Sequence, residues 1–324
     1  MEIAVIVPTY NRADLIGETL DSILRQSYHA AEIIVVDDGS TDNTESVVAR
    51  YGSAVKYLRI ANSGECAARN AGVACSSAPW VAFCDSDDLW LPEKLKLQVK
   101  VCQEVQDVDY CFTNFRTVMN GDWSDMSKFE TSPDGYWDLP RDELTLGLYV
   151  VRADMFPRLL RHQPIFPSTV LMKKTFFDAV GRWNESLGRT RSVDLEFHLR
   201  CVVRPPVGVV AAPVVGIRKH LGNFSSDAYR TTLGEIEILR YVLENHVAAR
   251  KYQEEIRRTI EERSAQAAGV AFASGDFTKT RQLLASVPLQ RRSWKLHLKA
   301  FISHAPERAA SLLRSWCVQN TAGN

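Results

Sequence analysis

Carboxylates recur near the start of the chain in segments that also contain small or hydroxyl-bearing residues. Asp37 and Asp38 precede a Gly-Ser-Thr segment, and Asp85, Asp87 and Asp88 surround a serine further along. Five carboxylates that met at one site would repel one another strongly without a cation. Carboxylate oxygens are hard ligands that suit Mg²⁺ or Mn²⁺, and such an ion can bridge to substrate phosphates. The pattern therefore predicts a site where a divalent ion neutralises a diphosphate.

Alternating strands and helices would bring these segments together. Apolar runs predict strands at residues 3–7, 32–36, 55–60, 80–84 and 110–118, and helical patterns predict helices at 14–26, 44–50, 65–74 and 93–104. Strands that alternate with helices of this length indicate βαβ units and a parallel sheet. Ligands bind such a sheet outside the carboxyl ends of its strands. We therefore expect one site at that edge, built from residues 8–12, 37–42, 62–72 and 85–88.

The composition is that of an ordinary soluble globular protein. The 324 residues include 39 Lys and Arg against 39 Asp and Glu, and 45% are hydrophobic. Zero net charge argues against a whole-chain nucleic-acid binder. The longest apolar stretch, from Pro205 to Ile217, is shorter than the roughly 20 residues of a membrane-spanning helix, and the first residues lack the pattern of a signal peptide. Seven cysteines without a C-x-x-C pair predict reduced core thiols in a cytoplasmic protein.

The character of the chain changes after about residue 225. We expect residues 1–228 to form the sheet domain and residues 229–324 an all-helical C-terminal domain, in which 267–288 form a helical hairpin. Residues 241–324 carry 13 Lys and Arg against 7 Asp and Glu. From Leu289 to Arg314, basic residues alternate with apolar side chains such as Trp294, which predicts an amphipathic helix. We favour packing of this helix on the sheet domain, and contact with a membrane surface or a protein partner is the alternative.

Two common nucleotide-binding motifs are missing from the sequence. It contains neither G-x-G-x-x-G nor G-x-x-x-x-G-K-[ST], which argues against a dinucleotide dehydrogenase and a P-loop NTPase. A nucleotidyltransferase would carry a Gly-rich loop with a basic residue after the first strand, and the segment from Thr9 to Arg12 does not fit that description. A nucleotide could still bind if a metal ion held its phosphates.

The ordered set of motifs resembles glycosyltransferase family 2, whose members have the GT-A fold. Each motif alone is weak, but the set at these spacings is specific, and it covers residues 1 to about 225. It consists of Val7 to Arg12, Val36 to Asp42, Ala68 to Gly72, Asp85 to Lys94, Pro167 to Thr169, Val180 with Gly181, Asp194 with Leu195 and Arg200, and Arg218 to His220. The resemblance implies an α/β fold of the GT-A type, with helices flanking a mostly parallel twisted sheet, followed here by an all-helical C-terminal region. It also implies a nucleotide-sugar donor and Mn²⁺ or Mg²⁺ as the cofactor.

The resemblance implies roles residue by residue. The residues that would bind the nucleotide sugar are Pro8, Thr9, Tyr10, Arg12, Asp37, Asp38, Gly64, Arg69, Asp85, Ser86 and Asp87. Among them, Thr9, Tyr10 and Asp38 resemble the base pocket, and Gly64 and Arg69 resemble the part that closes over the base and ribose. Asp87 and His220 resemble metal ligands, and Asp194 resembles the general base that takes the acceptor's proton. Three further residues could complete the site: Asp88, Trp183 and Arg218.

These expectations describe a metal-dependent inverting glycosyltransferase. It would move a hexose-type sugar from a UDP donor to a hydroxyl of a glycan, a lipid-linked or a small-molecule acceptor, as in polysaccharide biosynthesis. It would work in the cytoplasm or at the inner face of the membrane, with no nucleic acid as a partner. The alternative is a non-catalytic nucleotide-sugar-binding module with a helical protein-interaction tail, because Val193 stands where the family often has a second acid beside the base.

Some of these residues also have purely structural interpretations. Asp88 and Asp194 could cap helices, where an acid is favourable at the N-terminus, and His220 could be an ordinary surface histidine. Trp123 and Trp137 lie in a long loop that we predict at residues 120–140. Their rings could stack on a sugar or could anchor the loop.

Overall fold

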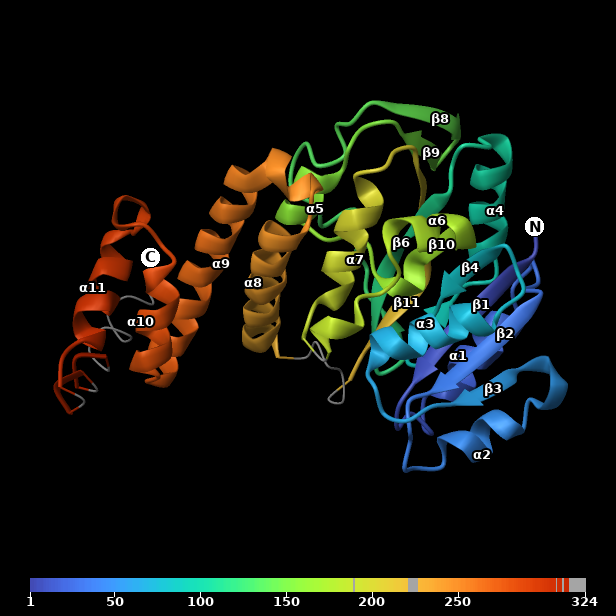
Figure 1. Cartoon of the computed structure of the whole chain (residues 1–324), viewed down its shortest axis with the longest axis horizontal. Coiled ribbons are helices and arrows are strands. Elements are labelled where there is room, and N and C mark those ends of the chain that lie inside the picture. The colour runs from blue at the N-terminus through green and yellow to red at the C-terminus, as the bar shows by residue number, and fades with distance from the viewer. Residues whose placement is uncertain (189, 221–226, 307, 311, 315–324) are drawn as a thin grey trace. The chain divides into compact units, whose positions relative to one another are not determined.

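Two structural units make up the chain, shown as a computed structural model in Figure 1. The structure describes residues 1–324 except 189, 221–226, 307, 311 and 315–324. The first unit comprises residues 1–189 and 193–226, and the second comprises 190–192 with residues from 227 onward. All residues of the expected site that the structure describes belong to the first unit.

One mixed sheet forms the centre of the first unit. Its strand order is β3-β2-β1-β4-β10-β6-β11-β9-β8, with β5 paired to β11 and β7 paired to β6. The strands are β1 (Ile3–Thr9), β2 (Glu32–Asp37), β3 (Lys56–Arg59), β4 (Trp80–Phe83), β5 (Leu89–Trp90), β6 (Tyr110–Met119), β7 (Asp122–Trp123), β8 (Arg141–Thr145), β9 (Leu148–Val151), β10 (Val170–Lys173) and β11 (Val207–Lys219).

Most of the long strands run in one direction. β1 pairs in parallel with β2 and β4, and β2 pairs in parallel with β3. β10 lies antiparallel between β4 and β6, so β6 and its parallel neighbour β11 keep the direction of β1. The carboxyl ends of β1 to β4, β6 and β11 therefore lie at the same edge of the sheet. The α/β fold with a mostly parallel sheet, expected from the sequence, is confirmed.

Helices cover both faces of this sheet. They are α1 (Ile16–Leu24), α2 (Thr44–Ala49), α3 (Glu65–Cys75), α4 (Lys94–Glu104), α5 (Phe156–Arg161), α6 (Lys174–Val180) and α7 (Val193–Val202). The odd-numbered residues of β1, such as Val5, share a buried cluster with Leu20 of α1. On the other face, Ile6 meets α3 at Gly72, where a Cβ atom would lie 2.3 Å from Ile6 Cγ2. Burial on both sides explains why every residue of β1 is apolar or small and fully enclosed.

The segment between β6 and β10 contains more regular structure than the sequence indicated. The loop expected at 120–140 includes only the short strand β7, whereas β8, β9 and α5, which follow it, were missed. Trp137 packs against Phe129 with ring centroids 4.1 Å apart, and Trp123 lies against Gly216 of β11. These contacts favour the loop-anchoring interpretation of both tryptophans.

The second unit is helical wherever the structure assigns regular elements to it. α8 (Ala228–Asn245) begins before residue 234, where the apolar periodicity starts, because Asp227 caps it by accepting a hydrogen bond from the Arg230 N–H at 3.0 Å. α9 (Gln253–Ser274) and α10 (Phe277–Ala285) form the expected hairpin. None of the helices among the described residues combines the length and apolar composition needed to cross a bilayer.

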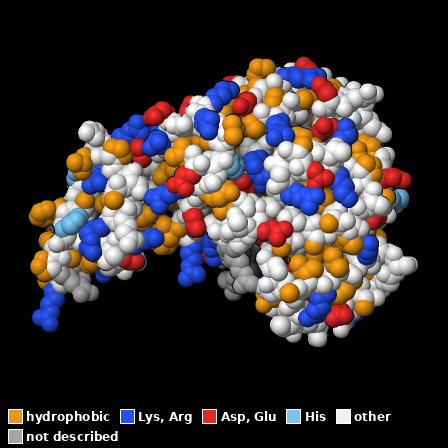
Figure 2. Space-filling view, viewed as in Figure 1, with side chains coloured by type: hydrophobic (Ala, Val, Ile, Leu, Met, Phe, Trp, Pro, Cys, Tyr) orange, Lys and Arg blue, Asp and Glu red, His pale blue; other side chains and the backbone are white. Residues whose placement is uncertain are grey.

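One helix of the second unit carries exposed aromatic side chains. α11 (Trp294–Ser303) packs on α9 and α10, and Ile302 lies in a small apolar cluster with Phe272. Trp294 and Phe301 remain 65% and 74% exposed. Figure 2 shows hydrophobic and basic side chains next to one another over this part of the molecule, at the left of the view. Packing of this segment on the sheet domain, and the alternative of contact with a membrane surface or a protein partner, both stay predictions.

Candidate active site at the strand ends

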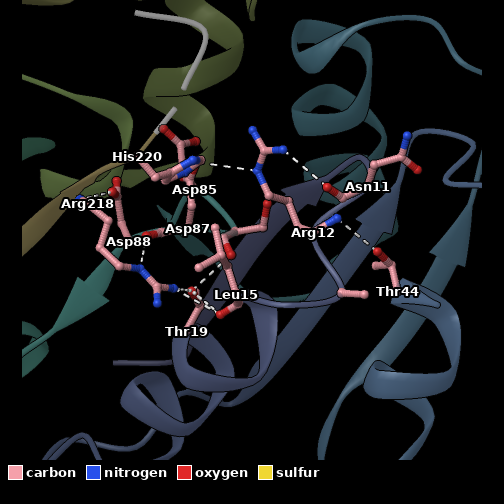
Figure 3. Close-up of polar contacts among 12 residues, drawn as sticks. Asn11, Arg12, Leu15, Thr19, Thr44, Asp85, Asp87, Asp88, Arg218 and His220 are labelled. Atoms are coloured by element: carbon pink, nitrogen blue, oxygen red, sulfur yellow. Dashed lines mark hydrogen bonds and ion pairs between the residues drawn. The ribbon is translucent and has the colours of Figure 1, made fainter. Parts of the chain in front are cut away.

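The loop after β4 carries Asp87 to the sheet edge, where two other strand ends meet it. Arg12 follows β1, and His220 follows β11 (Figure 3). The Asp87 Oδ2 atom is 3.4 Å from Arg12 Nε and 3.1 Å from His220 Nε2. Three segments far apart in the sequence therefore converge on one carboxylate.

The first acid of the D-x-D pair is held by a buried arginine. Arg69, on α3, donates from Nη2 to Asp85 Oδ1 at 2.8 Å and to Glu65 Oε2 at 2.9 Å, and it is only 1% exposed. Burial raises the pKa of Asp85, and the charge of Arg69 opposes that rise. The hydrogen bonds that Arg69 donates to described side chains are thus to carboxylates of the site. They position Asp85, a task that the resemblance did not imply for this arginine.

Asp88 ties the D-x-D loop to two other elements. Its Oδ2 atom accepts a hydrogen bond from the Ser168 hydroxyl at 2.5 Å, and its Oδ1 atom accepts one from the Arg218 N–H at 3.1 Å. The Ser168 oxygen also accepts a hydrogen bond from the Asp85 N–H at 2.9 Å. Burial raises the pKa of Asp88, and the neighbouring D-x-D carboxylates raise it further. Asp88 therefore helps to hold the D-x-D loop in position.

The side chain of Arg218 reaches the beginning of α1. Its Nη1 atom donates to Glu18 at 2.7 Å, and its Nη2 atom donates to the Leu15 carbonyl at 2.9 Å (Figure 3). Its Nε atom also contacts the Asp87 carbonyl oxygen. Arg218 therefore fixes the end of β11 that presents His220 to Asp87.

Asp38 shapes the loop that was expected to close over the nucleotide. Its two carboxylate oxygens accept hydrogen bonds from the N–H groups of Ser63 at 2.6 Å and Gly64 at 2.8 Å. Gly64 has a φ of +93°, a conformation that favours glycine, directly before α3. Asp37 is fully buried and accepts a hydrogen bond from the Tyr57 hydroxyl at 2.6 Å. Both acids thus support the strand ends, and Asp38 does so at the edge of the expected base pocket.

Polar groups at the end of β1 are placed to meet a ligand. Tyr10 is 45% exposed and follows Pro8 and Thr9, which close the strand. The buried Thr9 Oγ1 atom has no hydrogen-bond partner among the residues that the structure describes. Ser86 is also buried, and its carbonyl accepts a hydrogen bond from the Thr19 hydroxyl at 3.0 Å. Buried hydroxyls are nearly always hydrogen-bonded in folded proteins, so we expect a polar ligand or a water molecule to bond the Thr9 hydroxyl.

The expected base, Asp194, lies in the first turn of α7. Its Oδ2 atom accepts a hydrogen bond from Gln163 Nε2 at 2.9 Å. Burial raises the pKa of Asp194 to about 7, the Glu65 carboxylate adds to the rise, and Arg69 opposes it. Glu65 and Arg69 also flank Asp85, so the base and the D-x-D pair share neighbours. A carboxyl group that titrates near neutral pH is suited to general base catalysis.

Trp183 lies in the interior, close to the same arginine. It is 2% exposed, stacks on Phe197 with ring centroids 4.0 Å apart, and has the Arg69 guanidinium 4.6 Å from its ring centre. The Asn70 side chain donates to the Trp183 carbonyl at 2.9 Å. Trp183 therefore contacts Arg69, which in turn contacts the acidic residues of the site.

Sequence reasoning assigned no role to three supporting residues: Glu65, Ser168 and Gln163. Each contacts a charged residue of the site. Ser168 belongs to a segment that carried the family resemblance, which was a usable signal. Gln163 lies in no motif and is 31 positions from Asp194, so the fold alone reveals that contact.

The donor atoms present suit a metal ion only in part. Among the described residues, no group of three or more His, Cys, Asp or Glu side chains is arranged to hold an ion. Asp87 and His220 offer one carboxylate and one imidazole at a shared point. Mg²⁺ commonly takes one or two protein carboxylates and completes its shell with substrate phosphates and water. The pair therefore fits a divalent ion that arrives with a diphosphate.

Comparisons with known sequences match the chain to a family and to relatives within it. The family model described as Glycosyl transferase family 2 matches residues 4–159. TuaG of Bacillus subtilis, a putative teichuronic acid biosynthesis glycosyltransferase, is 31% identical over 204 residues, which cover 59% of this chain and 79% of TuaG. An uncharacterized glycosyltransferase of Rickettsia prowazekii is 31% identical over 198 residues, which cover 60% of this chain and 57% of the relative. The chain thus spans little more than half the length of the Rickettsia protein.

Solved structures of similar fold include that of TarS from S. aureus. The crystal structure of TarS residues 1–349 in complex with UDP aligns with 100% of this chain and 93% of TarS, at a TM-score of 0.63 and 19% identity. The complex with UDP-GlcNAc aligns with 97% of this chain and 89% of TarS, at a TM-score of 0.63 and 20% identity. These likenesses show the fold, and the matches to the family model and to TuaG show that the chain belongs to glycosyltransferase family 2.

Proposed function

We propose that this protein is a metal-dependent inverting glycosyltransferase that takes a hexose-type sugar from a UDP donor. The observation that carries the proposal is the convergence of Asp87, Arg12 and His220 from three strand ends, with the expected base close by. This arrangement offers groups for a metal-bound diphosphate on one side and a carboxylate for the acceptor on the other. Sugar transfer from a nucleotide donor requires groups that stabilise the leaving diphosphate and a base at the acceptor hydroxyl.

The proposed donor rests on the base pocket and on the structural neighbour. Tyr10 is exposed beside the buried Thr9 hydroxyl, and Asp38 orders the 62–64 loop at the same edge. TarS has been crystallised with UDP and with UDP-GlcNAc. The shared fold supports a UDP-sugar, with a UDP-hexose or a UDP-N-acetylhexosamine as the donor class.

Asp87 and His220 would hold the divalent ion, Mn²⁺ or Mg²⁺. When bound, the ion would neutralise the charge that builds up on the leaving diphosphate. Arg12 lies against the same carboxylate and would add a second positive charge beside the phosphates. Asp85 stays paired with Arg69, so it would meet the donor as a fixed acceptor of hydrogen bonds.

Asp194 would act as the general base. In the ionised state it takes the proton from the acceptor hydroxyl while that oxygen attacks the anomeric carbon opposite the leaving group, which inverts the configuration. Burial keeps the pKa of Asp194 near 7, so a large share of the carboxylate is ionised at neutral pH.

The acceptor class is proposed from relatives rather than from a built pocket. The printed name of TuaG places that protein in teichuronic acid biosynthesis, which supports a growing glycan as the acceptor and a place in polysaccharide biosynthesis. Lipid-linked and small-molecule acceptors stay within the proposal. A cytoplasmic location, at the inner membrane face for a lipid-linked acceptor, stays a prediction of the sequence.

A thermal-shift screen tests the donor directly. Nucleoside diphosphates and nucleotide sugars are added with and without Mn²⁺, and a ligand that binds the native state raises Tm by mass action. We expect UDP and one UDP-sugar to raise Tm only with Mn²⁺. UDP release is then measured for the wild type and for Asp194→Ala. Binding without turnover across all donors and acceptors would favour the nucleotide-sugar-binding module with a helical interaction tail.

A further inference from the structure

One short stretch of chain supports both halves of the proposed reaction centre. Residues 163–168 lie in the segment between α5 and β10. At one end, Gln163 donates to Asp194 at 2.9 Å, and at the other end, the Ser168 hydroxyl contacts both Asp85 and Asp88. The spacing between the base and the D-x-D loop is therefore set in part by this stretch.

The stretch is fixed by its own packing. Ile165 is fully buried, and Phe166 packs edge-on against Phe115 with ring centroids 5.0 Å apart. The Tyr136 hydroxyl donates to the His162 carbonyl at 2.9 Å, directly before Gln163. A side chain that extends from so constrained a backbone can hold its partner at a defined position.

We infer that Gln163 is the positioning residue for Asp194, an inference that rests on the function proposed above. Its amide N–H holds Oδ2 at 2.9 Å and orients the carboxylate, to which the Leu195 N–H is a second hydrogen-bond donor. The Gln163 amide nitrogen is 3.4 Å from the Ile165 carbonyl, which restricts the rotation of the side chain. Val193, the neighbour of Asp194 in the sequence, is buried and apolar and cannot perform this task.

An amide suits this position because it is a neutral donor among charged groups. The described titratable groups that act on Asp194, or on which it acts, include Glu65, Asp85, Arg69, Cys66 and Tyr110. Two of these are carboxylates, and a third carboxylate beside the base would favour its protonated form. A hydrogen-bond donor instead favours the ionised form, in which Asp194 can accept a proton.

The test measures the titration of Asp194 without needing to know the sugar. The carboxyl carbon of Asp194 is followed by NMR against pH in the full chain, and its signal is identified by its loss in Asp194→Asn. We expect Gln163→Met, which keeps the length of the side chain but lacks the donor, to raise the pKa of Asp194 by about one unit. Gln163→Glu should raise it further. The control, Gln103→Ala on the exposed face of α4, should leave it unchanged.

An unchanged titration in both Gln163 variants would overturn the inference, and the second variant keeps the test open if one fails to fold.

Turnover provides an independent readout, with UDP-GlcNAc and UDP-glucose as probes. In Gln163→Met we expect kcat to fall about tenfold while the KM for the donor stays unchanged. We also expect the acidic limb of the pH–rate profile to move to higher pH. Equal loss at every pH would indicate a packing defect and would also contradict the inference. A wild type inactive with every donor would defeat the proposed function, whereas the NMR titration would still decide whether Gln163 controls Asp194.

Discussion

At the residue scale, the strand-end acids differ in what their oxygens contact. Asp37 and Asp88 are buried and accept hydrogen bonds from hydroxyls and backbone N–H groups, as structural acids do. Asp87 instead faces Arg12 and His220, whose side chains are each 25% exposed. A ligand that brings a metal and a diphosphate could rearrange the contacts of Asp87 without unfolding the loop.

Asp194→Asn is expected to abolish turnover and keep UDP binding. The base must be ionised to accept a proton, so wild-type turnover should fall by about tenfold for each pH unit below the pKa of about 7. Because folding raises the pKa of this acid, its ionisation destabilises the folded state as pH rises from 4 to 7. The asparagine variant should therefore match or exceed the wild type in Tm at pH 8. UDP release and thermal melts across pH 5 to 9 check both points, and a flat pH profile would speak against Asp194 as the base.

Arg69→Ala is expected to lower the free energy of unfolding by about 3 kcal/mol, because it removes the buried cation between two carboxylates. This is the lower end for a broken buried pair, since Asp85 and Glu65 are partly exposed. Arg59→Ala is the matched control, because Arg59 also pairs with a glutamate, Glu45, but on the surface. That loss should be below about 1 kcal/mol. Urea unfolding of both variants measures the difference, and equal losses would contradict the structural role of Arg69.

At the element scale, the motifs and their strands could be predicted together, because apolar runs buried on both faces of a sheet are distinctive. The strands that became β1 to β4 and their polar ends were expected within a few residues. β8 was missed because its sequence, Arg-Asp-Glu-Leu-Thr, is mostly exposed and does not alternate. The contacts of Gln163 and Ser168 with the acids were missed for a different reason. They depend on how distant segments cross, which no local pattern encodes.

Gly72→Ala should weaken the packing of α3 on the sheet. The added Cβ would lie 2.3 Å from Ile6 Cγ2, in a β-branched side chain that is fully buried and cannot move aside cheaply. We expect a loss of about 1 to 3 kcal/mol in the free energy of unfolding. Gly17→Ala, in α1, is the control. The added Cβ would meet only ordinary van der Waals contacts, at 3.7 Å and beyond. This variant should be neutral or stabilise by up to about 1 kcal/mol. Chemical denaturation of both variants decides, and a neutral Gly72→Ala would contradict the close approach.

At the scale of the whole molecule, the residues of the proposed donor site all fall in the first unit, while the helices from α8 onward form the second. The domain division at 228/229 stays a prediction of the sequence, and in the structure the second unit resumes at Asp227. A role of this unit in acceptor binding or assembly stays a prediction, and the exposed aromatic residues of α11 are the part of it to test first.

Truncation after residue 226 should leave a folded domain that binds UDP with Mn²⁺. The sheet, its helices and every expected donor ligand are retained in that fragment. Circular dichroism melts check the fold, and the shift in Tm on adding UDP with Mn²⁺ checks the site. An unfolded fragment would show instead that the two units fold as one.

The central claim is that Asp87 and its neighbours hold a diphosphate through a divalent ion. Isothermal titration of UDP into the wild type and Asp87→Ala, with and without Mn²⁺, tests it most directly, with the loop variant Asp125→Ala as the control. We expect Mn²⁺ to tighten UDP binding at least about tenfold, or 1.4 kcal/mol, in the wild type and the control. That gain should vanish in Asp87→Ala while the circular dichroism spectrum stays the same. An equal gain from Mn²⁺ in Asp87→Ala would contradict the account.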